Sequence, residues 1–385
     1  MEIARLGPML EARLARDASN ADAMMDIATL SILTLIPENR PAAFAMQSRA
    51  IGVQQVFRIA ARRQPPALRV LAVASAGDMT AITPLDCLLE DSDVDLLMLY
   101  VRPGEAMSRD LPEHDLVFVA VGESPANRPV LAQVAEFLQG HDRPVLNTPE
   151  RVLELSRDSV SNRLRGVPGV TMPATARIRR TALDEVVSGK LRLAEVLEDG
   201  AFPVIARPLD SQGGKDLDRL ECPAALGDYL TRVAGDGFFI SRFIDYSGTD
   251  GHFRKVRVVM IEGRAYACHM AVSQRWMIHY VNADMDASAW KREEEARFME
   301  GFDTGFGARH AAALAGIDAR LGLEYYAIDC AETRSGELLV FEADTAMLVH
   351  GMDPVDLYPY KAPQMQKIFS AFRAMLGRKA LRGCA

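Results

Sequence analysis

Two carboxylates interrupt an apolar stretch near the C-terminus, LLVFEADTAMLVH at 338–350, where Glu342 and Asp344 stand two positions apart. Alternate residues of a β-strand point to the same side, so both carboxylates should lie on one face of a largely buried strand. Two buried negative charges repel each other and lose hydration, so such a pair needs a compensating positive charge.

The preceding apolar segment, LEYYAIDCAE at 323–332, supplies a third carboxylate, Asp329. If Ser335 and Gly336 form a two-residue hairpin loop, Asp329 lies directly across from Glu342, with about 5 Å between the Cβ atoms. Three carboxylates on one sheet face favour Mg²⁺, which prefers oxygen ligands and shares its site with substrate phosphates. The alternative is a solvent-facing carboxylate pair with arginine partners, and a one-residue slip would turn Asp329 to the other face.

A glycine turn follows another predicted strand, in VIARPLDSQGGKD at 204–216. Arg207 stands at the end of the strand, and Ser211, Gly213 and Gly214 follow it. The backbone N–H groups of such a turn can approach an anion closely, and a guanidinium offers a fork of donors that suits phosphate. Beside a Mg²⁺ site, the turn predicts the phosphate-binding half of a phosphoryl-transfer site.

Further basic and aromatic residues lie between these two segments. Lys255 and Arg257 alternate in FRKVRV, so they share one strand face, and an exposed basic stripe is the alternative interpretation. The segment CHMAVSQRWMIHYVNADM at 268–285 reads as a strand that leads into a substrate-lining loop. The residues predicted to contact substrate are His269, Arg275, Trp276, His279, His350 and Lys361.

Composition narrows the class of protein. A chain of 385 residues is too long for one ordinary core, and 49% hydrophobic with 25% charged residues is typical of globular proteins. A net charge of −8 argues against a nucleic-acid-binding surface. The five cysteines lie far apart, which favours buried reduced thiols in a cytoplasmic protein over a disulfide framework. No apolar run is long enough to span a membrane.

The pattern of elements changes along the chain. Residues 1–63 read as helices, with a second helix running from Pro41 to Arg63. Short β-rich runs at 68–75, 94–101, 114–121 and 143–147 then alternate with helical stretches, which predicts a parallel, doubly wound sheet. From about residue 151 the pattern is α+β.

In this order the segments resemble the ATP-grasp superfamily, near its glutathione-synthetase-like and ribosomal-modification-ligase-like branch. The resemblance rests on FPVIARP with its glycine turn, FFISRFI, KVRVVMIEG, YYAIDCAE and LLVFEAD, and it covers roughly residues 68–376. It implies an ATP-grasp fold that combines α/β and α+β parts. The implied domains are a helical, faintly tetratricopeptide-like extension at 1–63, an N-terminal α/β domain at 67–150, a central lid domain at 151–245, and a C-terminal domain at 246–385 that carries the metal site.

The resemblance also implies roles for matching residues. Asp329, Glu342 and Asp344 take the positions of the Mg²⁺ ligands, with Asp344 where asparagine is often found. Arg207, where lysine is usual, and Arg257 take catalytic positions next to the phosphates. The implied nucleotide-binding residues are Arg157, Arg207, Ser211, Gly213, Gly214, Arg242, Phe243, Ile244, Asp245 and Lys255.

The activity that the resemblance implies is ATP- and Mg²⁺-dependent joining of a small-molecule or peptide carboxylate to an amine through an acyl-phosphate. A small-molecule kinase of the same fold and a non-catalytic nucleotide-binding scaffold are the alternatives. The mass of the product distinguishes a ligase from a kinase, and loss of turnover on changing Glu342 distinguishes an enzyme from a scaffold. A homodimer through the N-terminal helices or the N-terminal sheet is one assembly that the sequence allows, whereas membrane and nucleic-acid partners are not expected.

Overall fold

The computed structural model describes residues 3–34, 36–78, 81–209, 211 and 213–382. The residues outside this description include Asp210 and Gln212 of the glycine turn, and also Met79, Thr80 and Cys384. The chain divides into two compact units. The first contains residues 1–152, 345–349 and 369–385, and the second contains residues 153–344 and 350–368.

The first unit is built on a five-stranded sheet in the order β1-β3-β2-β4-β5. β2, β3, β4 and β5 are parallel, which confirms the predicted parallel sheet, and β1 is antiparallel to β3. All eight residues of β3 are buried, as its nearly continuous apolar sequence predicts. The strands are β1 (Val56–Ile59), β2 (Leu68–Ser75), β3 (Val94–Val101), β4 (Leu116–Val119) and β5 (Val145–Leu146).

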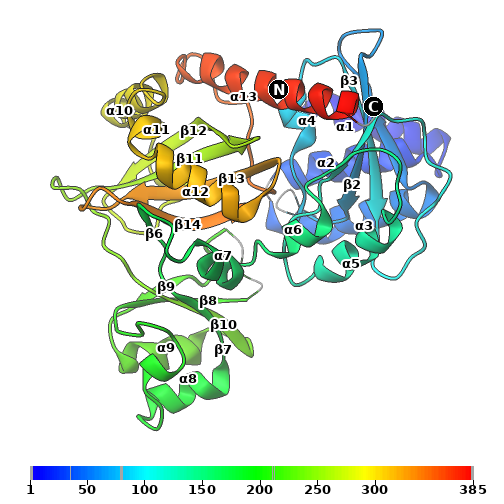
Figure 1. Ribbon diagram of the computed structural model, residues 1–385. Coiled ribbons are helices and arrows are strands. Elements are labelled where there is room, and N and C mark those ends of the chain that lie inside the picture. The colour runs from blue at the N-terminus through cyan, green and yellow to red at the C-terminus, as the bar shows by residue number, and fades with distance from the viewer. Residues whose placement is uncertain (1–2, 35, 79–80, 210, 212, 383–385) are drawn as a thin grey trace. The chain divides into compact units, whose positions relative to one another are not determined.

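Helices of the first unit precede and connect these strands (Figure 1). They are α1 (Ile3–Arg16), α2 (Ala21–Leu33), α3 (Arg40–Val53), α4 (Leu85–Leu88), α5 (Arg128–Phe137) and α6 (Pro149–Leu153). The predicted second helix is wrong beyond Val53, because VFRI at 56–59 forms the edge strand β1 instead. Pairing with β3 overrides the helical pattern there.

The second unit begins with a small four-stranded sheet in the order β7-β10-β8-β9. Helices α8 and α9 cover one face of it, around a core that includes Leu183, Tyr229 and Phe238 (Figure 1). The elements are α7 (Arg157–Leu164), β7 (Thr175–Arg179), α8 (Arg180–Val187), β8 (Val204–Pro208), β9 (Asp218–Leu220), α9 (Pro223–Arg232) and β10 (Gly237–Arg242). The glycine turn lies between β8 and β9.

A larger antiparallel sheet, in the order β12-β11-β13-β14-β6, completes the second unit, with β6 alone parallel to its neighbour. Its strands are β6 (Val170–Thr171), β11 (Phe253–Ile261), β12 (Arg264–Ser273), β13 (Tyr325–Glu332) and β14 (Leu338–Asp344). Its helices are α10 (Ala289–Glu300), α11 (Phe306–Arg309) and α12 (Ala311–Leu321). Helix α13 (Lys361–Arg382) begins in the second unit, and its residues from Phe369 onward belong to the first. A hairpin turn at Glu262 and Gly263 joins β11 to β12.

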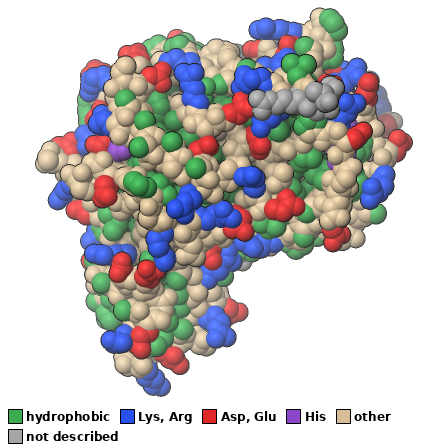
Figure 2. Space-filling view, viewed as in Figure 1, with side chains coloured by type: hydrophobic (Ala, Val, Ile, Leu, Met, Phe, Trp, Pro, Cys, Tyr) green, Lys and Arg blue, Asp and Glu red, His purple; other side chains and the backbone are tan. Residues whose placement is uncertain are grey.

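On the face drawn in Figure 2, basic and acidic side chains are interspersed rather than gathered into large patches of one sign. Among the described cysteines, all free thiols, Cys268 and Cys330 are buried as predicted, whereas Cys222 is exposed. No helix in the described part of the chain combines the length and apolarity needed to cross a bilayer.

Candidate active site

The two carboxylate strands pair as predicted. β13 and β14 are antiparallel, and Asp329 lies directly opposite Glu342. The turn differs from the prediction, because Thr333 N donates to Glu337 O at 2.9 Å and leaves three residues in the loop. Gly336 occupies its left-handed position with φ 83°. A bulge beside Asp329 then adds one residue to β14 and restores the predicted alignment.

Asp329 is fully buried and is compensated by two cations from β11. Its carboxylate accepts hydrogen bonds from Arg257 Nε at 2.7 Å and Nη2 at 3.0 Å, and Lys255 Nζ lies 2.7 Å from Oδ2. Burial opposes ionisation, but attraction by Arg257 and then Lys255 holds the pKa of Asp329 well below its usual range. The group is therefore a carboxylate at neutral pH.

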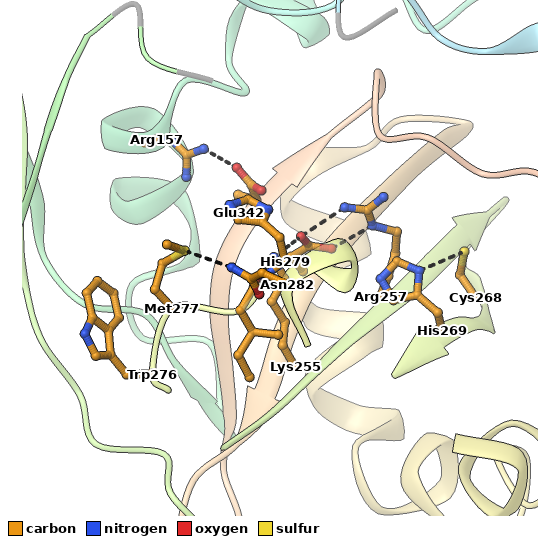
Figure 3. A network of polar contacts seen from close by, with 12 residues as sticks. Arg157, Lys255, Arg257, Cys268, His269, Trp276, Met277, His279, Asn282 and Glu342 are labelled. Atoms are coloured by element: carbon orange, nitrogen blue, oxygen red, sulfur yellow. Dashed lines mark hydrogen bonds and ion pairs between the residues drawn. The ribbon is translucent and has the colours of Figure 1, made fainter. Parts of the chain in front are cut away.

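Glu342 forms an ion pair with Arg157 at the start of α7, which Figure 3 shows from close by. Burial raises the pKa of Glu342 and Arg157 lowers it, with a net shift below the usual value. Asp344 lies opposite Ala327, so it follows Glu342 on the same face of β14. The three predicted Mg²⁺ ligands thus share one side of the hairpin, and the predicted phosphate contact Arg157 lies beside them.

Arg207 is a buried cation at the end of β8, with only 7% of its surface exposed. Its Nη2 donates to the Ser211 carbonyl, and the Ser211 hydroxyl donates to the carbonyl of Lys215, which folds the turn back on itself. Its Nε is buried without a hydrogen-bond partner among the described residues. Burial, and then repulsion by Arg157, lowers the pKa of Arg207 to about 10. A buried, unfilled donor on a destabilised cation is suited to an incoming anion.

The glycine turn touches the loop after β12. Gly214 has φ 72°, and a Cβ atom there would collide with Nε2 of His279. Gly213 has φ 59° and open space around its Cα. Glycine is therefore required at 214 by both the backbone conformation and the neighbouring imidazole. Burial, and then Lys255, lowers the pKa of His279, so its ring is neutral at pH 7.

Four of the implied nucleotide-binding residues lie at the end of β10 and just after it. Phe243 N donates to the Pro203 carbonyl at 3.0 Å, and the guanidinium of Arg219 lies 4.0 Å above the Phe243 ring. Arg242 and Asp245 are exposed and Ile244 is half-buried. The Asp245 carboxylate accepts from Ser247 N at 2.9 Å, and this bond lowers its pKa.

The predicted substrate residues differ in how far they are exposed. His269 lies opposite Arg257 across β11 and β12, and burial and Arg257 hold its pKa well below the usual value. Arg275 is exposed, and the ring of Trp276 meets Phe243 edge-on at 5.8 Å. In contrast to Arg275, Lys361 is buried, with 4% of its surface exposed. His350 is half-buried, and its Nδ1 accepts a hydrogen bond from Met352 N at 3.1 Å.

Similarity to proteins of known structure indicates the fold of this chain. Neither the family models nor the curated protein sequences that were compared match this chain. Among solved structures, the D-Ala:D-Ser ligase VanG from Enterococcus faecalis is 12% identical, with 80% of this chain and 99% of that chain covered and a TM-score of 0.50. The D-alanine–D-alanine ligase from Bacillus anthracis complexed with ATP is 14% identical, with 82% and 98% covered and a TM-score of 0.49.

The chain has an ATP-grasp fold. This confirms the fold expected from the order of strands, and identities of this size support the fold alone. In the ATP-grasp fold of this chain, four cationic side chains, Arg157, Arg207, Lys255 and Arg257, lie around the carboxylates Asp329 and Glu342. Positive charge is in excess of these two carboxylates, and it remains in excess when Asp344 is counted.

The carboxylates of the site supply part of a metal site. Within the described residues, no three His, Cys, Asp or Glu side chains come close enough together to form a complete metal site. Asp329 and Glu342 nonetheless offer carboxylate oxygens from directly opposed positions. Mg²⁺ is usually held by one or two carboxylates and completed by phosphates and water, so this pair fits the metal of a nucleotide complex.

Sequence reasoning missed a buried network behind this ATP-grasp site. Glu295 on α10 is fully buried and accepts hydrogen bonds from Tyr280 and Tyr360, while Lys361 lies 3.6 Å from it. Glu295 belongs to the charged run KREEEAR, which reads as a solvated helix face. Its only sequence signal is its place on the same helix side as Met299, four residues later and buried.

Proposed function

We propose that this protein is an ATP- and Mg²⁺-dependent ligase that joins a carboxylate to an amine through an acyl-phosphate. The observation that carries the proposal is the cluster of four cations around Asp329 and Glu342 inside an ATP-grasp fold. Its excess positive charge suits a triphosphate, and its carboxylates, Asp329 buried and Glu342 half-buried, suit the accompanying metal.

Phosphate binding falls to residues of the glycine turn and the cation cluster. Arg207 offers its unfilled Nε, and Gly213 and Gly214 allow the backbone to approach an oxygen closely. Arg157 can exchange its contact with Glu342 for a phosphate. Asp329 and Glu342 would hold Mg²⁺, which when bound neutralises the charge that develops on the phosphates.

In the proposed reaction, a carboxylate oxygen of the first substrate attacks the γ-phosphorus of ATP, and the bond to the bridging oxygen breaks to release ADP. The amine nitrogen of the second substrate then attacks the acyl carbon, loses a proton and displaces phosphate. Arg257, fixed by its two bonds to Asp329, is placed to stabilise the transferred phosphoryl group. Positioning and charge compensation therefore do most of the work.

Small-molecule or peptide carboxylates and amines are the proposed substrates, since Arg275 and Trp276 offer a cation and an aromatic face beside the site. The cytoplasm, which supplies ATP and keeps thiols such as Cys268 reduced, is the proposed compartment.

The test is ADP release by the purified protein with ATP, Mg²⁺ and a panel of amino acids, peptides and polyacids, followed by the mass of the product. We expect Glu342→Gln to reduce turnover by about a hundredfold or more, because it removes a charge that faces the metal and phosphates. Glu337→Gln, at the exposed end of the same hairpin, is the matched control and should retain full turnover.

A product lighter than the sum of two substrates by one water supports the ligase. A substrate that gains a phosphate would instead identify a kinase. Intact nucleotide binding with no carboxylate-stimulated ADP release would refute the proposal in both forms.

A further inference from the structure

The segment between β12 and α10, residues 274–288 (the 274–288 loop), touches the phosphate side of the site at two points. His279 lies against Gly214, and the carbonyl of Ile278 accepts a hydrogen bond from Lys255 at 3.3 Å. His279 N also donates to Asn282 Oδ1 at 2.9 Å, which closes the next turn (Figure 3). The position of this loop therefore sets the surroundings of both the glycine turn and a cation of the site.

Tyr280, the next residue in this loop, is held by a buried carboxylate. Its hydroxyl donates to Glu295 Oε2 at 2.7 Å, and Tyr360 donates to the same oxygen at 2.6 Å. The other oxygen, Oε1, accepts from Met270 N of β12 at 3.0 Å. A fully buried Glu295 thus joins β12, α10, the loop and the segment before α13 at one point.

Lys361 holds Tyr280 from the other side. Its Nζ donates to the Tyr280 hydroxyl at 2.7 Å and lies 4.1 Å from the centre of the Tyr280 ring and 4.4 Å from that of Tyr358. It also lies 3.3 Å from Asp353 Oδ1. With one bond donated to Glu295 and one accepted from Lys361, the Tyr280 hydroxyl is fixed in direction as well as in place.

Burial raises the pKa of Glu295 in spite of Lys361 and the two tyrosines, so its charge is poorly compensated. Buried ionic groups contribute little net stability, whereas they can fix one arrangement of the chain over others. The ring of Tyr280 also packs against His269 at 5.0 Å, next to Arg257. The network is therefore well placed to orient the neighbouring residues of the site.

We propose that Glu295, Lys361 and Tyr280 form a positioning network that fixes the 274–288 loop, so that His279 supports the glycine turn and Ile278 supports Lys255. The functional part of this inference rests on the proposed nucleotide site. Tyr280 is the residue through which the network acts, because it alone of the three belongs to the loop.

Tyr280→Phe is compared with Tyr360→Phe, which removes a hydroxyl from the same oxygen of Glu295 outside the loop. We expect Tyr280→Phe to raise the KM for ATP at least fivefold with kcat at saturating ATP within twofold of wild type. Tyr360→Phe should leave both constants within twofold. Urea unfolding of both variants identifies any change that follows lost stability alone.

A second readout needs no activity. The chain contains two tryptophans, Trp276 in the loop and Trp290 on α10, so Trp290→Phe leaves Trp276 as the only reporter. In that background, Tyr280→Phe should at least double the rate of acrylamide quenching of Trp276 fluorescence, and Tyr360→Phe should leave it unchanged.

Equal effects of the two tyrosine substitutions on both readouts, or no effect of Tyr280→Phe on either, would overturn the positioning network. If the wild-type protein neither binds nor turns over ATP, the proposed function fails instead. The quenching comparison then still decides whether the network orders the loop.

Discussion

Arg207 should lower the stability of the protein without nucleotide and strengthen its binding of nucleotide. It is buried, its Nε has no partner among the described residues, and neighbouring Arg157 repels it. We predict that Arg207→Met stabilises the protein without nucleotide while weakening its binding of nucleotide. Methionine replaces the aliphatic stem of the side chain and removes the buried charge.

The magnitude follows from burial and the neighbouring Arg157, which lower the pKa of Arg207 from its ordinary value to about 10. At about 1.4 kcal/mol per unit, the folded state disfavours the cation by roughly 3 kcal/mol. The substitution also loses the hydrogen bond to the Ser211 carbonyl, worth about 1 kcal/mol. The free energy of unfolding should therefore rise by about 2 kcal/mol. At pH 7 both states carry the charge, so the full effect is present there.

Nucleotide binding should change in the other direction. A hydrogen bond between a guanidinium and a phosphate contributes about 1.5–3 kcal/mol, so its loss weakens binding by roughly 10- to 150-fold. Urea unfolding without ligand measures the first effect, and titration calorimetry with ATP and Mg²⁺ measures the second. Arg232→Met is the control, because its side chain is 62% exposed and pairs with Asp218 at the surface.

Both measurements together decide the role of Arg207. A variant that is less stable by more than about 1 kcal/mol and binds nucleotide normally would show that the guanidinium is a structural anchor of the turn. The phosphate-binding assignment of this turn would then be wrong. The control variant should stay within about 0.5 kcal/mol of wild type in both measurements.

Two further predictions concern the neighbouring groups. Gly214→Ala should lower the free energy of unfolding by about 1–3 kcal/mol and weaken nucleotide binding, because φ 72° and the His279 ring both oppose a Cβ atom. Gly213→Ala is the control, because only its positive φ opposes a Cβ atom. Urea unfolding and titration calorimetry compare the two variants. His269 has a pKa well below its usual value, so the unfolded chain binds a proton that the folded chain does not as pH falls below about 6.5. Below about pH 6.5, His269 should therefore lower the free energy of unfolding by about 1.4 kcal/mol per pH unit. Urea unfolding at pH 7, 6 and 5 measures this dependence, and His269→Gln should remove the contribution of His269 to it.

The pairing of Asp329 with Glu342 could be predicted from sequence, although the route to it was partly wrong. The loop holds three residues rather than two, which alone would place Asp329 opposite a different residue. The bulge in β14 compensates for that shift. Burial of one face requires the carboxylates to stay on the same side, so the periodicity of two proved a better guide than the turn.

Contacts between distant segments could not be predicted in the same way. Apart from the spacing to Met299, nothing local marks Glu295 as the buried member of EEEARF, because its partners Tyr280, Tyr360 and Lys361 come from two other parts of the chain. The helix predicted through residue 63 failed for a similar reason, since β1 exists through its pairing with β3. Tertiary partners decide both cases.

The charges of the site argue for a ligand that the protein itself does not supply. Asp329 has Lys255 and Arg257, and Glu342 has Arg157, so these carboxylates are already compensated in the unliganded chain. Arg207 is the buried cation of this site whose Nε has no partner among the described residues, and burial and repulsion by Arg157 lower its pKa. An arriving phosphate would fill the donor and compensate the charge in one step. It would also draw Arg157 from Glu342 and leave a carboxylate open to Mg²⁺, which makes phosphate and metal binding mutually reinforcing.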